Sequence, residues 1–111
     1  MKLLLVIRYQ IDPFKREAFK RHAENLIAPV PRCGGRLLGF YVPHEGTNDV
    51  AWALLGIDNL ADYEAYRARL KDDPDARADA AWMRDNRVIL REERNFVALV
   101  EGTFDIPPTP T

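Results

Sequence analysis

Two neighbouring segments of this 111-residue chain are apolar at both odd and even positions, and this pattern constrains the fold more than any other feature. Residues 36–44 and 50–55 are typical of two strands joined by a polar turn at residues 45–48. A strand with one face in water alternates apolar with polar residues. Because neither parity is polar here, we expect both faces of this hairpin to be covered. Helices can cover one face, and a chain of this length leaves the other to a second subunit.

A strand and a helix are expected before the hairpin. The odd positions of residues 1–11 are all apolar, which predicts a strand with one buried face. Asp12 and Pro13 suit the N-cap and the first position of a helix. Pro29 and Pro31 are expected to end or kink that helix. Its inward stripe at helical spacing is predicted to be Phe19, Ala23, Leu26, Ile27 and Val30.

Two helices and a fourth strand are expected after the hairpin. Asp58-Asn59, with Asp62 three residues further on, is typical of a capping box and predicts a helix through Leu70. Asp73-Pro74 ends that helix and starts an Ala-rich one to about residue 86. A strand over about residues 88–100 has a polar middle that suits a sheet edge. The inward residues of the two helices are predicted to be Leu60, Tyr63, Tyr66 or Arg67, Leu70, Ala76, Ala80 and Met83.

The order of these elements defines an α+β fold. Strand, helix, strand, strand, helix, helix, strand, joined by right-handed crossovers, gives a ferredoxin-like βαββααβ antiparallel sheet with helices on one face. Two such sheets that cover each other's bare faces form a dimeric α/β barrel. We expect one domain over residues 1–101 and a Pro-rich C-terminal tail over residues 102–111.

Short motifs along nearly the whole chain support the same fold. They lie at residues 9–13, 34–41, 43–48, 58–63, 66–70, 73–74 and 88–94. In these motifs the chain resembles the NIPSNAP family. The resemblance implies a homodimeric ferredoxin-like barrel of the dimeric α/β-barrel superfamily, and an activity that the family itself leaves undefined.

Charge and composition exclude several classes of function. Sixteen basic and seventeen acidic residues give a net charge of -1, which provides no electrostatic footprint for nucleic acid. No apolar run approaches membrane-spanning length, so we expect no membrane insertion. A single cysteine, Cys33, favours a reducing compartment, and we predict a cytoplasmic protein. The two histidines lack metal-ligand spacing and no phosphate-binding glycine loop is present, so neither a metal nor a cofactor is predicted.

The candidate site residues concentrate around the hairpin. His44, beside Glu45 and close to Thr47, could act as a catalytic acid or base near neutral pH, or it could merely cap the strand at a turn. Arg36, Tyr41 and Trp52 could line a ligand pocket together with His44. In the alternative interpretation Tyr41 and Trp52 belong to the core and Arg36 is a surface charge.

Cys33 and His22 are interpreted as residues without a catalytic role. Cys33 could pair with His22 or His44, but no activating base is visible and a free thiol is favoured. His22 borders the apolar stripe of the first helix and is predicted to be a half-buried packing residue.

Two hypotheses of function follow from the sequence. The first is a homodimer of undefined activity that binds a small molecule or a protein partner. The alternative is a cofactor-independent monooxygenase-like or isomerase-like enzyme that acts on a small aromatic substrate. The sequence leaves open whether the protein is an enzyme.

Overall fold

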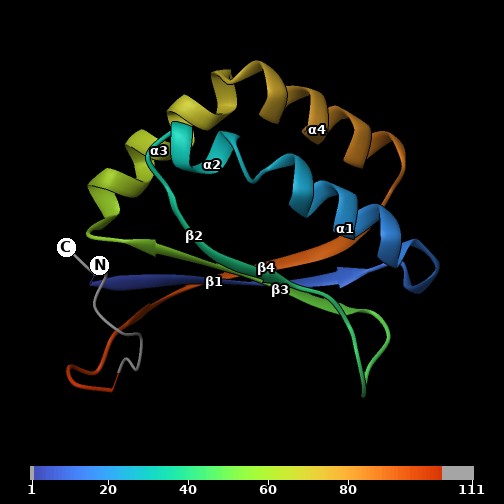
Figure 1. Ribbon diagram of the computed structural model, residues 1–111, viewed down its shortest axis with the longest axis horizontal. Helices are drawn as coiled ribbons and strands as arrows, with labels where there is room; N and C mark the ends of the chain where they lie inside the picture. The colour runs from blue at the N-terminus through green and yellow to red at the C-terminus, as the bar shows by residue number, and fades with distance from the viewer. Residues whose placement is uncertain (1, 104–111) are drawn as a thin grey trace.

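Four antiparallel strands form one sheet, and the helices lie together on one side of it (Figure 1). This computed structural model describes residues 2–103. The strand order is β2-β3-β1-β4, which confirms the predicted ferredoxin-like arrangement and places β4 at an edge. The elements in chain order are β1 (Leu3–Ile11), the 3-10 helix η1 (Pro13–Lys15), α1 (Arg16–Asn25), α2 (Pro29–Arg32), β2 (Arg36–Tyr41), β3 (Val50–Ile57), α3 (Leu60–Asp72), α4 (Pro74–Asp85) and β4 (Ile89–Ala98).

The predicted helix starts are confirmed by their capping bonds. The Asp12 carboxylate accepts from the Phe14 N–H at 2.9 Å, and the Asn59 side chain accepts from the Asp62 N–H at 2.8 Å. Asp73 accepts from the backbone N–H groups of residues 75 and 76 at the start of α4. Each bond satisfies an N–H that has no partner within its own helix.

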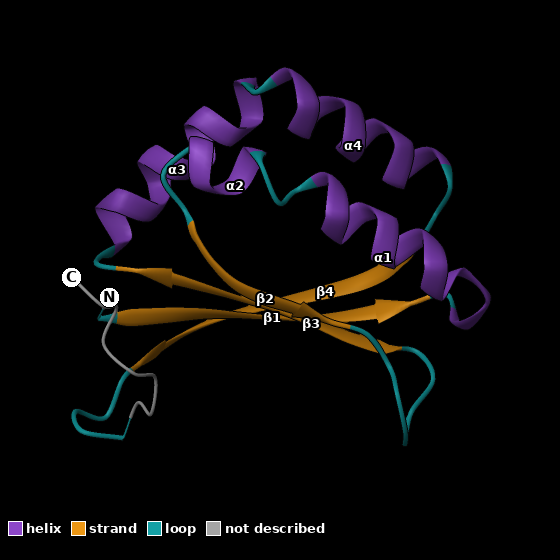
Figure 2. Ribbon diagram, viewed as in Figure 1, coloured by secondary structure: helices purple, strands orange, loops and turns teal. Residues whose placement is uncertain are grey.

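The two layers meet along one face of the central strands (Figure 2). In β1 the odd residues Leu5, Ile7, Tyr9 and Ile11 are buried against the helices, as the alternation predicts. Residues 51, 53 and 55 of β3 lie beside them in register and are buried too. The core is completed from the helical layer by Phe19, Val30, Cys33, Tyr66 and Met83.

The helical layer differs from the prediction at three residues, one of which is Ala80 of α4, predicted to point inward but exposed. The first helix is interrupted between Asn25 and Pro29, since proline has no N–H to continue the hydrogen-bond ladder. Ile27 lies in that interruption and is 62% exposed, so its predicted inward position is wrong. Leu60 is 55% exposed because it is the first residue of α3, and its predicted inward position is wrong as well.

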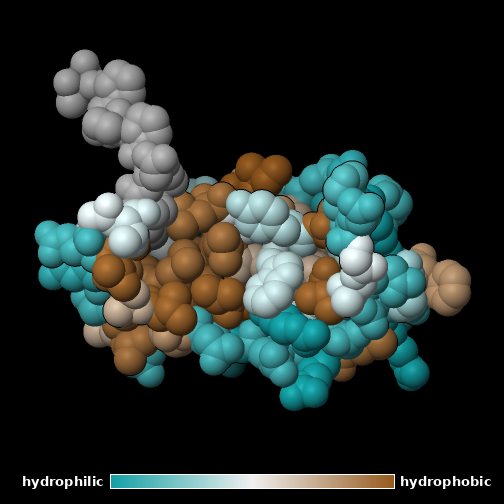
Figure 3. Space-filling model, turned by 90° about the horizontal axis from the view of Figure 1, so that it is seen from below, coloured by the Kyte–Doolittle hydropathy of each residue, from teal (hydrophilic) through white to brown (hydrophobic). Residues whose placement is uncertain are grey.

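The sheet face opposite the helices carries apolar side chains at one end and charged ones at the other (Figure 3). Val6 pairs with Leu54 there, and Leu4 with Val97. Within residues 2–103 no helix covers this face (Figure 1). This face thus carries apolar side chains without a helix over it, and its predicted cover by a second subunit stays a prediction.

Two further expectations concern the C-terminal tail and membrane-spanning helices. Beyond residue 103 the predicted Pro-rich tail lies outside the described residues. In the described part of the chain, no helix has the length and apolar character needed to cross a bilayer.

Candidate functional site

A cavity of about 1020 Å³ lies between the sheet and the helices. Its volume is at the upper end of the range of pockets that hold small molecules. The sheet contributes apolar side chains from β1 and β3 together with Phe40, and residues 92 and 94 of β4 line it as well. From the helical layer it is lined by His22, Leu26, Val30, Tyr66, Arg67, Ala68, Leu70, Lys71, Asp72, Ala76, Arg77, Asp79, Ala80, Ala81 and Arg84.

The cavity exists because the helices present short side chains to it. Ala68 of α3 and the residues at 76, 80 and 81 of α4 are all alanines on its wall. An alanine ends at Cβ, so space that a leucine would fill remains open between helix and sheet. Met83, one turn further along α4, is buried in the core instead.

Two tyrosine hydroxyls face this space without a hydrogen-bond partner. Tyr9 is 4% exposed and Tyr66 is 3% exposed, and neither hydroxyl is bonded to any of residues 2–103. No fully buried side-chain N or O atom in that range lacks a partner, so both hydroxyls reach the cavity. Burial raises the pKa of Tyr66 to about 12 and raises that of Tyr9 as well, with Glu92 adding to the shift. Both side chains therefore remain O–H donors at neutral pH.

A guanidinium is held beside the tyrosines at the edge of the sheet. Arg94 Nε donates to Glu92 Oε2 at 2.5 Å, and its Nη1 donates to the Tyr63 hydroxyl at 2.9 Å. The bond from Arg94 to Tyr63 joins β4 to α3, and Arg67 Nη1, one turn further along α3, donates to the same hydroxyl at 3.0 Å. Burial disfavours the charged form of Arg94, but Glu92 and Tyr63 outweigh it and raise its pKa.

A buried imidazole and carboxylate lie on another part of the wall. His22 Nδ1 is 2.5 Å from Asp79 Oδ2, and Asn25 Nδ2 donates to Asp79 Oδ1 at 3.1 Å. The imidazole ring packs against Phe19 and Phe40 at centroid distances of 5.5 and 5.7 Å. Its Nε2 has no partner among the described residues. A carboxylate on one ring nitrogen orients the other as a proton acceptor.

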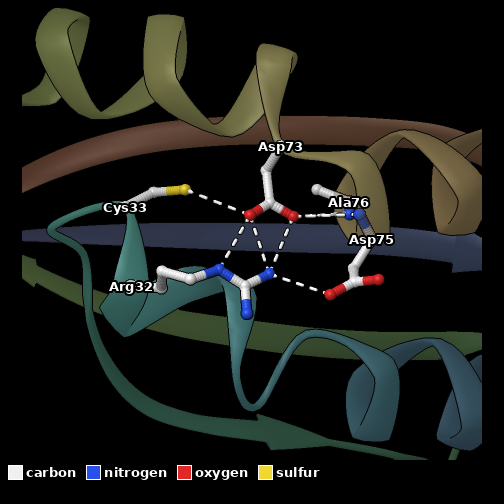
Figure 4. A network of polar contacts seen from close by, with 5 residues as sticks. All are labelled: Arg32, Cys33, Asp73, Asp75 and Ala76. Carbon is white, nitrogen blue, oxygen red and sulfur yellow. Dashed lines mark hydrogen bonds and ion pairs between the residues drawn. The ribbon is translucent and has the colours of Figure 1, made fainter.

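A second polar cluster fastens α2 to the start of α4 (Figure 4). Arg32 Nε donates to Asp73 Oδ2 and its Nη2 donates to Oδ1, both at 2.9 Å. Arg32 Nη2 also reaches Asp75 at 3.0 Å. Cys33 Sγ lies 3.9 Å from Asp73 Oδ2 and is buried, which confirms a free thiol. Since Asp73 also caps α4, this cluster has a structural role.

The structure separates the four residues predicted to form a ligand site. Tyr41 and Trp52 are paired across β2 and β3 on the face away from the helices, 53% and 40% exposed, so neither is in the core of the chain. Arg36 pairs with Gly56 at the far end of β2, and His44 is exposed in the connection to β3. None of the four lines the cavity. Their role in ligand binding stays a prediction.

The cavity residues were missed because their proximity depends on the fold. Tyr9 and Glu92 are neighbours only through the β1–β4 pairing. One signal was present: Asp79 is a carboxylate between the predicted inward residues Ala76 and Ala80 of an Ala-rich helix. His22 was predicted to be half-buried and is 9% exposed. In the described part of the chain, no three His, Cys, Asp or Glu residues are grouped to hold a metal ion.

The structure defines a ferredoxin-like α+β domain with a cavity between sheet and helices. The family model named NIPSNAP matches residues 4–102, and the chain belongs to the NIPSNAP family. The resemblance noted in the sequence is thereby confirmed. Comparison with curated proteins gives no match.

Solved structures of low sequence identity share this fold. An uncharacterized NIPSNAP domain protein from Burkholderia xenovorans is 21% identical with a TM-score of 0.75, over 93% of this chain and 99% of that one. A NIPSNAP family protein of unknown function from Agrobacterium tumefaciens is 19% identical with a TM-score of 0.81, over 92% and 91%. A provisionally assigned antibiotic biosynthesis monooxygenase from Nitrosomonas europaea is 11% identical with a TM-score of 0.66, over 88% and 98%. At these identities the likeness concerns the fold alone.

Proposed function

We propose that this NIPSNAP-family chain acts as a homodimer that binds a small molecule in the cavity between its helices and its sheet. The observation that carries the proposal is the pair of hydroxyls, on the largely buried side chains of Tyr9 and Tyr66, that reach the cavity without a partner among residues 2–103. A hydroxyl on a cavity wall that has no protein partner is left to hydrogen-bond a ligand or water. A free thiol at Cys33 agrees with a cytoplasmic site of action.

The bare sheet face supports the homodimer. Exposed apolar side chains on one contiguous face mark an interaction surface. The charges on that face are mixed, with Glu93 4.0 Å from Arg8 and 3.0 Å from Arg91. A second copy related by a two-fold axis would present the same apolar and charged groups in reverse order, as a self-complementary interface requires. Tyr41 and Trp52 would then lie in the interface.

A pair of α4 variants tests the cavity as the ligand site. Ala80→Trp places a large ring at the cavity wall, whereas Ala78→Trp changes an alanine of the same helix that is also exposed but does not line the cavity. The purified proteins are denatured and the released small molecules are identified by mass spectrometry. We expect a compound from wild type and Ala78→Trp that is missing from Ala80→Trp. The same compound from Ala80→Trp, or none from wild type, would contradict the proposal.

A second candidate function is favoured by the His22–Asp79 pair. With Asp79 on Nδ1, the Nε2 of His22 can take a proton from a bound substrate while the carboxylate stabilises the imidazolium. This geometry suits an isomerase-like reaction on a small aromatic ketone. The check is hydrogen–deuterium exchange at the α-carbon of 2-tetralone in D₂O, followed by NMR. Exchange above the buffer rate that is lost in His22→Gln would support this function, and exchange at the buffer rate would exclude it for this substrate.

A further inference from the structure

Two unpartnered hydroxyls on the cavity wall can donate hydrogen bonds to a ligand. The hydroxyls of Tyr9 and Tyr66 each offer an O–H, and the raised pKa values keep these protons in place at neutral pH. Tyr9 pairs with Glu92 across β1 and β4, and Glu92 in turn accepts from Arg94, so Tyr9 and Arg94 lie at one end of the cavity. Arg94 also donates to the hydroxyl of Tyr63, which lies on α3 with Tyr66. That end is therefore built to receive an acceptor oxygen.

The guanidinium of Arg94 adds an oriented cation to the same end. Its Nε and Nη1 are engaged by Glu92 and Tyr63, while Nη2 has no partner among residues 2–103. The hydrogen bond from Nε to Glu92 holds the planar guanidinium in one orientation and leaves Nη2 available to a ligand. A fixed guanidinium with a free N–H is a preferred partner of a carboxylate.

The charge around the cavity favours an anion. Five basic side chains line it against three acidic ones, although the whole chain carries a net charge of -1. Two of the three acids are already engaged, Asp79 with His22 and Glu92 with Arg94. The other basic residues on the wall are Arg67, Lys71, Arg77 and Arg84.

The remaining surface of the cavity is apolar. Leu5, Ile7 and Leu55 line it from the sheet, and Leu26 and Leu70 from the helical layer. These side chains suit the apolar body of a ligand whose polar group is at the end formed by Tyr9, Tyr66 and Arg94.

We infer that the cavity binds a small carboxylic acid, whose carboxylate is received by the hydroxyls of Tyr9 and Tyr66 and by Nη2 of Arg94 while its apolar body lies against the leucines of sheet and helices. This inference rests on the proposed function and specifies its ligand class. A carboxylate oxygen accepts several hydrogen bonds, so one anionic group can satisfy all three donors. A cationic ligand would leave them unsatisfied and would be repelled by Arg94.

Two probes of the same shape test whether the cavity prefers a negatively charged ligand. 2-Naphthoate carries the carboxylate, and 2-naphthamide replaces it with a neutral amide. Binding of each to the ¹⁵N-labelled full chain is followed by NMR titration, which gives affinity and location together. We expect naphthoate to bind at least tenfold more tightly, with the largest shifts at residues 9, 66 and 94.

Variants test the named donors. We expect Tyr9→Phe and Tyr66→Phe each to weaken naphthoate binding about tenfold, since each removes one hydrogen bond to a charged group. The same two substitutions should weaken the binding of naphthamide less. Tyr41→Phe, which removes a hydroxyl on the opposite sheet face, should leave the affinity unchanged. Arg94→Gln should abolish the preference for naphthoate, whereas Arg91→Gln, on the same strand but the other face, should preserve it.

The possible failures are distinguishable. Equal affinity for the two probes, with binding of both lost in Ala80→Trp, would overturn the carboxylic-acid class and leave the cavity as the ligand site. Naphthoate binding that Tyr41→Phe weakens and Tyr66→Phe does not would overturn the assignment and favour the hairpin residues. If neither probe binds, the inference is overturned. The proposed function is then tested separately, by whether a compound is extracted from wild type and Ala78→Trp and is missing from Ala80→Trp.

Discussion

His22 and Asp79 join α1 to α4 through a 2.5 Å contact between Nδ1 and Oδ2. Both side chains are buried, and Asn25 supplies a second hydrogen bond to the same carboxylate. The pair thus has two consequences: it orients the imidazole on the cavity wall, and it joins α1 to α4, which also meet where the Arg21 guanidinium lies 5.4 Å from the centroid of the Trp82 ring.

Removing the Asp79 carboxylate should destabilise the fold. Asp79→Ala leaves the buried Nδ1 of His22 and the amide of Asn25 without their partner, and we expect a loss of about 2 kcal/mol in the free energy of unfolding. Urea denaturation measures the loss. Asp85→Ala, at an exposed position of the same helix, should change stability by less than about 0.5 kcal/mol. Equal effects of the two substitutions would show that the contact does not stabilise the chain.

Gly35 is required for the position of the Tyr66 ring. A Cβ at residue 35 would lie 2.7 Å from Tyr66 Cε1 and 3.0 Å from Val30 Cγ1. We expect Gly35→Ala to cost about 1–3 kcal/mol, because these buried groups must shift. The shift should also weaken naphthoate binding. Gly39→Ala is the matched control, since its new Cβ meets only the exposed Tyr41 ring at 3.1 Å or more. Comparable losses for both variants in urea denaturation would contradict the steric account.

Stability at acid pH should depend on Arg32. Burial alone would raise the pKa of Asp73, but the Ala76 N–H and the Arg32 guanidinium outweigh it and hold the pKa below its ordinary value of 3.8. The stabilisation that the ionised Asp73 carboxylate contributes is therefore present above pH 3.8. It is lost as the pH falls through the lowered pKa of Asp73.

The Arg32→Gln variant isolates that contribution. Its unfolding free energy should be lower than that of wild type at neutral pH, and the difference should shrink as the pH is lowered below 3.8. Lys20→Gln, an exposed change on α1, should follow the wild-type pH curve. Denaturation series at several pH values measure this. A difference that stays constant down to full protonation would show that Asp73 is not the partner responsible.

The bare sheet face should control assembly. Trp52→Glu introduces a charge into the proposed interface, where an unpaired buried charge is strongly unfavourable. We expect wild type to sediment as a dimer and Trp52→Glu as a folded monomer. Leu60→Glu changes another exposed apolar residue, at the start of α3, and should remain a dimer. A monomeric wild type at micromolar concentration would refute the homodimer.

Local signals in the sequence predicted the architecture well. The caps at Asp12, Asn59 and Asp73 follow from neighbours two or three residues away, and the buried face of β1 follows from a period of two. The exceptions are Ile27, at the break between α1 and α2, Leu60, at a helix start, and Ala80, which is exposed on the cavity wall. Helical periodicity does not apply across a break, and it does not predict a space that opens beside a helix.

The candidate site could not be predicted in the same way. His22 and Asp79 are 57 positions apart, and Tyr9 meets Glu92 only through strand pairing. A cavity is space that side chains fail to fill, so alanines such as Ala76 and Ala80 indicate it only once the opposing strand is known. His44 was predicted as a candidate because turn residues are easily identified in a sequence. A tyrosine hydroxyl without a partner can be identified only in three dimensions.

Native mass spectrometry of freshly purified wild type tests the central claim most directly, because it reports assembly and ligand together. The account predicts a dimer that carries the same small-molecule mass once per chain, and a dimer without that mass for Ala80→Trp. A monomer, or a bound mass that Ala80→Trp retains, would contradict the claim that the cavity between helices and sheet is the ligand site of a homodimer.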